Sequence, residues 1–300
     1  MSQECYTRID LARRVEYDAL WASAPSRSID YSLVNLWGWA HYFGLSWRFA
    51  SGLCWLRQMH PAPCQWAPVG PWAGIDWATL PELAAGMELT RVPEALVAIL
   101  EQRLPGRVIA EEDRNHWEYL YATQDMAQLP GNRYHRKRNH MNAYIRAYGE
   151  PDYRPLDMDV IEDILALSEE WCRWHECADS PALAAENDAI NHVLAHWGRF
   201  PHLLGGALYA EKQIVAFAVG EELDPGMVGV HFEKGRHGYR GVYQMVNCCF
   251  AHSQKAEVTL LNRAQDLGEE GLRQAKLSYL PVDFLRKYKV RIAPKQGSPL

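Results

Sequence analysis

The order of elements expected in the second half of the chain constrains its fold more than any other feature. Hydrophobic periodicity and turn residues predict two leading helices, three strands, a helix, a strand, a helix and a last strand. In chain order the expected ranges are 158–177, 181–198, a hairpin over 202–223, then 226–234, 242–253, 258–264, 267–277 and 287–293. This order favours an α/β (α+β) fold in which helices flank a mixed sheet.

The first half carries a less regular mixture of the same elements. Helices are expected over 81–87 and 92–104, and strands over 107–112 and 116–123. Residues 126–149 contain no Asp or Glu, although the chain has 37 acidic residues. We therefore predict an N-terminal domain over 1–130, a basic connector over 131–150 and a C-terminal domain over 151–300.

Composition narrows the class of protein. The net charge of −6 means that binding of an anion must be local. Twelve tryptophans indicate large buried areas or pockets. Seven cysteines without a repeated CxxC spacing, and no leader sequence, predict a reducing cytoplasm and mostly buried thiols. No apolar run approaches the roughly 20 residues of a membrane helix, so at most we expect peripheral contact with the inner membrane.

Lys276 breaks the pattern of the helix expected at 267–277. At 100° per residue it falls on the same side as Leu272, Ala275 and Tyr279. It either serves the helix dipole at the surface or extends out of an apolar face. The alternative is that it turns into a cleft and meets an anion or a developing oxyanion. Asp266 and Glu269 have the spacing of a capping box at the start of this helix.

Glu186 is a second exception. It lies within the apolar stripe formed by Leu183, Ile190, Val193, Leu194 and Trp197, on a helix with Ser180 as N-cap, Pro181 in its first turn and an end at Gly198. A carboxylate there needs a partner, because an unpaired buried charge is unfavourable. Either it forms a structural ion pair with an arginine, or it holds a substrate ammonium or acts as a general base.

Two anion-binding features remain open. The turn "KGRHGYRG" opens a helix, but no window fits the Q/R-x-x-G-x-G/A spacing of coenzyme A-dependent acetyltransferases. The connector could bind RNA phosphates, face anionic lipid, or be a solvated helix. A second basic group lies at Arg286, Lys287, Lys289, Arg291 and Lys295.

Cys172, His175 and Glu176 are expected to pack rather than bind a metal.

Three segments together resemble a bacterial family. They are "RYHRKRNHMNAYIRAYG", "VGVHFEKGRHGYRGVYQMVN" and "LNRAQDLGEEGLRQAKLSYLP". The family is related to the cytosolic C-terminal domain of phosphatidylglycerol lysyltransferases. The resemblance implies two tandem GNAT-like acyltransferase domains, with a working cleft only in the second. It also implies kinship with Fem-type peptidyl transferases and leucyl/phenylalanyl-tRNA–protein transferases, which take an aminoacyl group from charged tRNA.

The resemblance implies an aminoacyl transferase and assigns site residues. The expected catalytic residues are Lys276, Glu186 and Glu233. The expected substrate-binding residues are Lys234, Gln244, Asn262, Asp266, Arg273 and Ser278. Phosphates of tRNA would be bound by Arg133, Arg136, Lys137 and Arg138.

The donor expected is aminoacyl-tRNA, with no metal and no cofactor. The acceptor would be a lipid, a peptide or a small molecule, and the membrane-spanning half of the lysyltransferases is absent from this sequence. Glu186 and Lys276 are expected to converge on one hollow. The alternatives are a coenzyme A-dependent N-acyltransferase and a non-catalytic module that binds RNA or an anionic membrane.

Overall fold

The computed structural model describes residues 5–295, which form two compact units. The first unit contains the chain as far as Glu118, together with residues 265–270 and the segment from Phe284 onward. The second contains residues 119–264 and 271–283. These units differ from the predicted ranges: the division falls at 118 rather than 130, the predicted connector 131–150 is part of the second unit, and residues 265–270 and those from Phe284 onward return to the first unit.

The first unit is built on a seven-stranded sheet with the order β1-β2-β3-β4-β5-β14-β6. The strands are β1 (Thr7–Arg8), β2 (Ser46–Ala50), β3 (Leu53–Gln58), β4 (Cys64–Trp66), β5 (Met87–Pro93), β6 (Val108–Glu112) and β14 (Lys287–Ile292). The α-helices are α1 (Arg14–Ser23), α2 (Leu33–Gly38), α3 (Ala40–Phe43) and α4 (Glu94–Arg103). The last strand lies between β5 and β6, antiparallel to both, which is why the C-terminal segment belongs to this unit.

The helix predicted over 81–87 is wrong. The structure has a short 3-10 turn at Pro81–Leu83, and Met87 already begins β5. Gly86 causes the change, because its φ of +81° is a left-handed conformation that a helix does not continue. A Cβ at Gly86 would lie 2.8 Å from the carbonyl oxygen of Ile292, so β14 also requires a glycine there.

A buried charge network joins β14 to the rest of the first unit. Lys287, a member of the second basic group of the sequence, is fully buried and contacts the carboxylates of Asp30 and Glu118. Arg91 forms a second ion pair with Asp30 at 3.0 Å. Ser28 donates to Glu118 at 2.6 Å. Two carboxylates thus face two cations, the balance that buried charges need.

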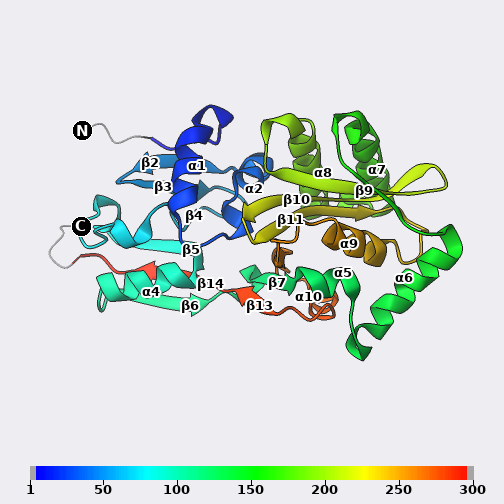
Figure 1. The fold of residues 1–300 in the computed structure, drawn as a ribbon. Helices are drawn as coiled ribbons and strands as arrows, with labels where there is room; N and C mark the ends of the chain where they lie inside the picture. Colours follow the sequence, from blue (N-terminus) through cyan, green and yellow to red (C-terminus); the bar gives the residue numbers. More distant parts are fainter. Residues whose placement is uncertain (1–4, 296–300) are drawn as a thin grey trace. The chain divides into compact units, whose positions relative to one another are not determined.

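The second unit is built on another seven-stranded sheet, with the order β13-β7-β12-β11-β10-β9-β8. The strands are β7 (Glu118–Ala122), β8 (Asp152–Pro155), β9 (Leu203–Ala210), β10 (Gln213–Asp224), β11 (Met227–Gly235), β12 (Leu260–Asn262) and β13 (Asp283–Leu285). The α-helices are α5 (Thr123–Gln128), α6 (His135–Tyr148), α7 (Ile161–Trp174), α8 (Pro181–Leu194), α9 (Val242–His252) and α10 (Glu270–Leu277). In Figure 1, α7 and α8 cover one face of β9, β10 and β11, and α9 covers the other face.

Local chemistry explains how two of these helices begin. Ser180 caps α8 by accepting a hydrogen bond from the Leu183 amide at 3.4 Å, with Pro181 at the first position, as predicted. The helix ends at Leu194, before the predicted Gly198. At the start of α9, Gly241 has φ +81°, and a Cβ there would lie 2.2 Å from the His140 carbonyl oxygen of α6. Only glycine lets the two helices approach this closely.

Among the helices of residues 5–295, none combines the length and the apolar character needed to cross a bilayer.

Candidate functional site

The candidate site lies where two parallel strands of the second unit diverge. β11 and β12 pair only over Met227–Gly229 and Leu260–Asn262. Beyond that point β11 continues to Gly235, beside β10 alone. The opening between the two strands exposes side chains from both to a common space.

One ion pair spans this opening. Arg263, just after β12, contacts Glu233 of β11 with 2.8 Å between Nη2 and Oε2. Asn247 of α9 donates a second hydrogen bond to Glu233. Burial by itself would lower the pKa of Arg263, but Glu233 and the neighbouring tyrosines outweigh it and the pKa is raised. Arg263 is therefore held as a cation beside a carboxylate.

A cavity of about 10 Å³ adjoins this pair. It is lined by Met126, Ala218, Val230, Glu233, Asn247, Phe250, Leu261 and Arg263. That volume fits about one water molecule. An acyl group that enters between the strands must therefore displace the side chains that close the opening.

Tyr279, after α10, lies next to this ion pair. The Arg263 guanidinium is 5.3 Å from the centre of its ring, and the Lys137 ammonium is 3.9 Å from it. Lys137 also lies 2.6 Å from the Ser278 hydroxyl. Burial raises the pKa of Tyr279 to about 12, so its hydroxyl stays neutral near pH 7.

The structure decides between a surface Lys276 and an inward one. Lys276 is the buried residue of α10, and its Nζ donates to the main-chain carbonyl of Arg263. Its own carbonyl accepts from the Tyr121 hydroxyl at 2.9 Å. Leu272, predicted to lie on the same buried side, is 43% exposed. The helix thus buries its cation rather than its leucine.

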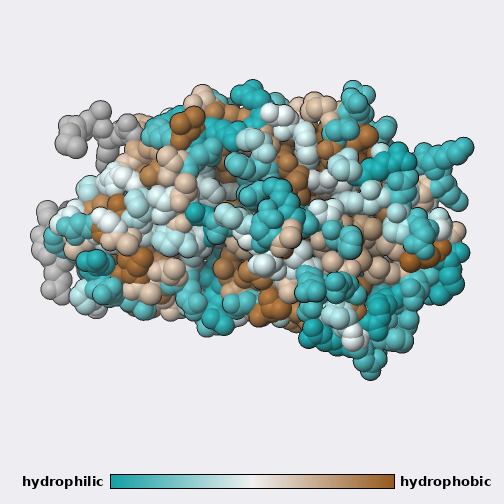
Figure 2. All heavy atoms as spheres, viewed as in Figure 1, coloured by the Kyte–Doolittle hydropathy of each residue, from teal (hydrophilic) through white to brown (hydrophobic). Residues whose placement is uncertain are grey.

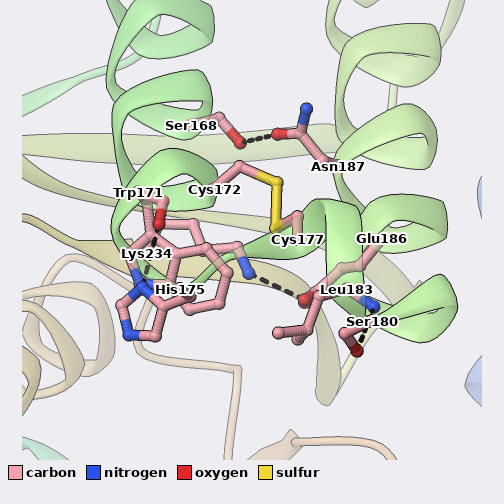
Figure 3. Close-up of a disulfide and its surroundings, with 10 residues drawn as sticks. All are labelled: Ser168, Trp171, Cys172, His175, Cys177, Ser180, Leu183, Glu186, Asn187 and Lys234. Atoms are coloured by element: carbon pink, nitrogen blue, oxygen red, sulfur yellow. Dashed lines mark hydrogen bonds and ion pairs between the residues drawn. A yellow bond between two sulfur atoms is a disulfide. The ribbon is translucent and has the colours of Figure 1, made fainter.

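A second charged pair lies on the other face of the sheet. Lys234 of β11 contacts Glu186 of α8 with 2.7 Å between Nζ and Oε2, and its ammonium is 3.4 Å from the Trp171 ring centre. Burial lowers the pKa of Lys234, and Glu186 and Glu233 oppose that shift. The partner of Glu186 is a lysine rather than the predicted arginine (Figure 3).

The predicted convergence of Glu186 and Lys276 is therefore wrong. Glu186 of α8 pairs with Lys234 on the face of the sheet that α7 and α8 cover. Lys276 instead donates to Arg263, and the partner of Arg263, Glu233, is hydrogen-bonded to Asn247 of α9 on the other face. Consecutive strand residues point to opposite faces, so Glu233 and Lys234 leave β11 on different sides.

The cysteines beside this second pair also differ from expectation. Cys172 and Cys177 form a disulfide that links the end of α7 to the turn before α8, where reduced thiols were predicted (Figure 3). His175 stacks on Trp171 with ring centres 3.8 Å apart. This stacking agrees with the expectation that His175 packs against its neighbours. The disulfide arises because the turn returns the chain to α7 within five residues.

Asp266 belongs to the first unit, whereas the other predicted site residues belong to the second. It forms an ion pair with Arg114 at 3.1 Å and accepts from the Gly268 amide at 2.8 Å. The predicted capping box with Glu269 is wrong, because α10 begins only at Glu270 and Asp266 closes a tight turn before it.

The remaining substrate-binding candidates lie on β12, on α9, on α10 and directly after α10. Asn262 is fully buried and accepts from the Ala264 amide at 3.0 Å, so it shapes the chain as it leaves β12. Gln244 of α9 is half-buried and acts on the pKa of Tyr279. Arg273 is half-buried on α10, and Ser278 is exposed.

The four residues predicted to bind tRNA phosphates differ in their partners and in their exposure to solvent. Arg138 donates to the carbonyls of Leu129 and Gly131, and Arg133 pairs with Asp125 at 2.7 Å. Lys137 belongs to the candidate site, and Arg136 is exposed. Figure 2 shows hydrophilic side chains over α6, consistent with a solvated basic helix.

Sequence reasoning missed Arg263, Asn247 and Tyr279 as members of the site. All three stand in the segments that carried the family resemblance. The sequence did contain one signal: Arg263 directly follows a short apolar strand, so it lies at the carboxyl end of that strand.

The comparisons agree with the architecture. The fold is GNAT-like: each unit is a mixed, mostly antiparallel sheet flanked by helices, which confirms the predicted fold class. The chain belongs to the family described as phosphatidylglycerol lysyltransferase, C-terminal, which matches residues 22–291.

Several solved structures and one curated protein are similar to this chain. A conserved protein of unknown function from Bacteroides thetaiotaomicron VPI-5482 is 30% identical, covers 97% of this chain and 100% of its own, and superposes with a TM-score of 0.86. L-PGS from Bacillus licheniformis is 11% identical over 99% and 96% of the two chains, with a TM-score of 0.63. FemX is 8% identical over 95% and 97%, with a TM-score of 0.58.

An uncharacterized protein of Mycoplasmoides gallisepticum is 27% identical over 186 residues. That match spans 62% of this chain and 58% of the length of the relative.

Proposed function

We propose that this protein is an acyltransferase that moves an aminoacyl group from charged tRNA to an amine or hydroxyl acceptor. Family membership supports the reaction class, as do the names of two similar structures, L-PGS and FemX. The observation that carries the proposal is the Glu233–Arg263 pair across the opening between β11 and β12. It sets one carboxylate and one cation beside the space where strands of this sheet separate.

The reaction requires the protein to position the two reactants and to stabilise the charge that develops during transfer. The ester of an aminoacyl-tRNA is already activated, so attack by the acceptor needs no covalent intermediate on the enzyme. Glu233 would hold the ammonium of the aminoacyl group. Arg263, supported through its carbonyl by Lys276, would face the oxyanion that develops at the ester carbon.

The other expected residues take supporting places in this proposal. Gln244, Arg273 and Ser278 would line the approach from α9 and α10. Arg133 and Arg136 would contact the phosphates of the acceptor stem. Glu186 and Lys234 would brace α8 against the sheet from its other face.

The test is transfer from tRNA charged with a labelled mixture of amino acids. Three acceptors are offered: vesicles containing phosphatidylglycerol, a lysine-containing peptide, and a small primary amine. Glu233→Gln should lower the rate by roughly 10²–10³-fold. Glu222→Gln is the matched control, because Glu222 lies on the adjacent β10 with a 38% exposed side chain.

Two results would refute the proposal. One is no transfer to any of the three acceptors by the wild-type protein. The other is a folded Glu233→Gln variant with the wild-type rate. A thermal shift with acetyl-coenzyme A in place of tRNA-dependent transfer would instead favour a coenzyme A-dependent acyltransferase.

A further inference from the structure

Lys137 is held in an unusual position for a residue of a basic surface helix. Its ammonium is 2.6 Å from the Ser278 hydroxyl and 3.9 Å from the centre of the Tyr279 ring. Ser278 in turn donates to the Ala275 carbonyl at 2.5 Å, which fixes the hydroxyl that Lys137 meets. The side chain thus lies over the Tyr279 ring, which the Arg263 guanidinium also contacts.

The surroundings of Lys137 disfavour its charged form. Arg263, after β12, contacts the same Tyr279 ring. From α10 and the residues after it come Ser278 and Tyr279, and from α9 the Cys248 thiol acts on Tyr279. Glu233 is the carboxylate of this group, and it is bound to Arg263 and Asn247. Burial, and then repulsion from Arg263, lower the pKa of Lys137 to about 8.

We propose that Lys137, positioned by Ser278, is the base that takes the proton from the attacking amine or hydroxyl. This inference rests on the proposed function and adds the residue that makes the acceptor nucleophilic.

The step balances as follows. The acceptor nitrogen or oxygen forms a bond to the ester carbon, and the bond from that carbon to the ribose oxygen of the donor breaks. The acceptor proton moves to the Lys137 amine. It then passes to the departing ribose oxygen, which leaves as a hydroxyl and returns Lys137 to its neutral form.

Other groups of the site are poorly suited to accept this proton. The Glu233 carboxylate already accepts from Arg263 and Asn247. The Lys276 ammonium donates to the Arg263 carbonyl, and Tyr279 keeps its proton because its pKa is about 12. A base works best when its pKa lies near the working pH, which Lys137 satisfies.

The first experiment reads Lys137 without any assay of activity. The full-length protein is pulsed with acetic anhydride between pH 6 and pH 11, and acetylation of Lys137 is quantified by mass spectrometry. The same residue in the urea-denatured chain is the reference. We expect a midpoint of about 8 in the folded protein, against an ordinary lysine value of 10.5. Coincident midpoints would overturn the inference.

The second experiment separates a base from a phosphate contact. Lys137→Arg keeps the charge but cannot accept a proton at neutral pH. We expect Lys137→Arg and Lys137→Met each to lose roughly 10²–10⁴-fold in transfer rate. Trimethylamine, which has no proton to lose and so cannot become a stable acceptor, should partly restore Lys137→Met, and the wild-type rate should rise toward a plateau above about pH 8. Lys255→Met is the control, since the Lys255 side chain is 72% exposed.

The outcomes distinguish this inference from the proposed function. An active Lys137→Arg variant would overturn the role of Lys137 and leave aminoacyl transfer intact. Absence of transfer by the wild-type protein would overturn the proposed function and this inference together.

Discussion

Glu233 and Lys234 are consecutive residues of β11, yet each forms an ion pair on a different face of the second sheet. Glu233 contacts Arg263 at 2.8 Å near α9, and Lys234 contacts Glu186 at 2.7 Å beneath α7 and α8. Because side chains alternate along a strand, one dipeptide supplies both the proposed reaction site and a brace behind it. The two pairs can therefore be removed separately.

Removing the Glu186–Lys234 ion pair should lower the stability of the protein and leave the transfer rate unchanged. Glu186→Gln leaves the Lys234 ammonium, only 4% exposed, without its carboxylate. We expect a loss of about 1.5–3 kcal/mol in unfolding free energy, because the Lys234 ammonium then has a neutral amide oxygen as its acceptor in place of a carboxylate. The double variant Glu186→Gln/Lys234→Met should recover part of this loss. Chemical denaturation measures the stabilities, and a folded double variant that has lost transfer activity would contradict the assignment of two faces.

Replacing Lys276 should affect the reaction more than the fold. Lys276→Met preserves the volume of the buried side chain but removes the donor to the Arg263 carbonyl. We expect a transfer rate roughly 10²–10³-fold lower, since Arg263 then loses its support opposite the oxyanion. Leu272→Gln, on the exposed side of the same helix, should leave both the rate and Tm unchanged. A fully active Lys276→Met variant would remove this lysine from the mechanism.

Binding of tRNA should depend on Arg136, an exposed arginine in the first turn of α6. Arg136→Gln should weaken binding and reduce the slope of log K against log salt by about 0.7–0.9, the value for one lost phosphate contact. Arg154→Gln is the control, because this exposed arginine on β8 already pairs with Asp152 at 2.5 Å. Filter binding at several salt concentrations measures both variants, and equal slopes would refute a phosphate contact.

The contribution of Lys137 to stability should rise with pH between about pH 8 and pH 10.5. The pKa of Lys137 is about 8 in the folded chain and 10.5 when unperturbed. In that window the unfolded chain binds more protons than the folded one, so raising the pH favours folding. Lys137→Met lacks this contribution, and its Tm relative to wild type should fall as the pH increases from 8 to 10.5. A constant difference in Tm would contradict the lowered pKa.

Reduction of the disulfide should destabilise the junction of α7 and α8. Cys172 and Cys177 are five residues apart, and closing so short a loop contributes about 2 kcal/mol by restricting the unfolded chain. Dithiothreitol should lower Tm for the wild type but not for Cys172→Ser/Cys177→Ser. Equal shifts in both proteins would place the effect elsewhere.

The sequence pattern predicted the fold class and marked Lys276 as an exception, but it left open whether that lysine is buried and did not predict the arrangement of the site. Periodicity is local, so it found β11, α9 and the cap of α8. It placed Leu272 inside because it assumed that the apolar residues of a short helix face the core. The opening beside Glu233 depends on where β11 and β12 stop pairing, and strand pairing is a long-range property. Arg263 could be identified only once that opening was known.

The position of β14 has a consequence for synthesis of the protein. The strand between β5 and β6 of the first sheet, and the lysine that neutralises Asp30 and Glu118, come from residues 287–292, which follow every other strand of both sheets in the sequence. The amino-terminal half therefore leaves the ribosome with a gap in its sheet and two buried acids without their lysine. It can reach its native form only after residues 287–292 have been made, so the half that is synthesised first is completed after the strands of the second unit.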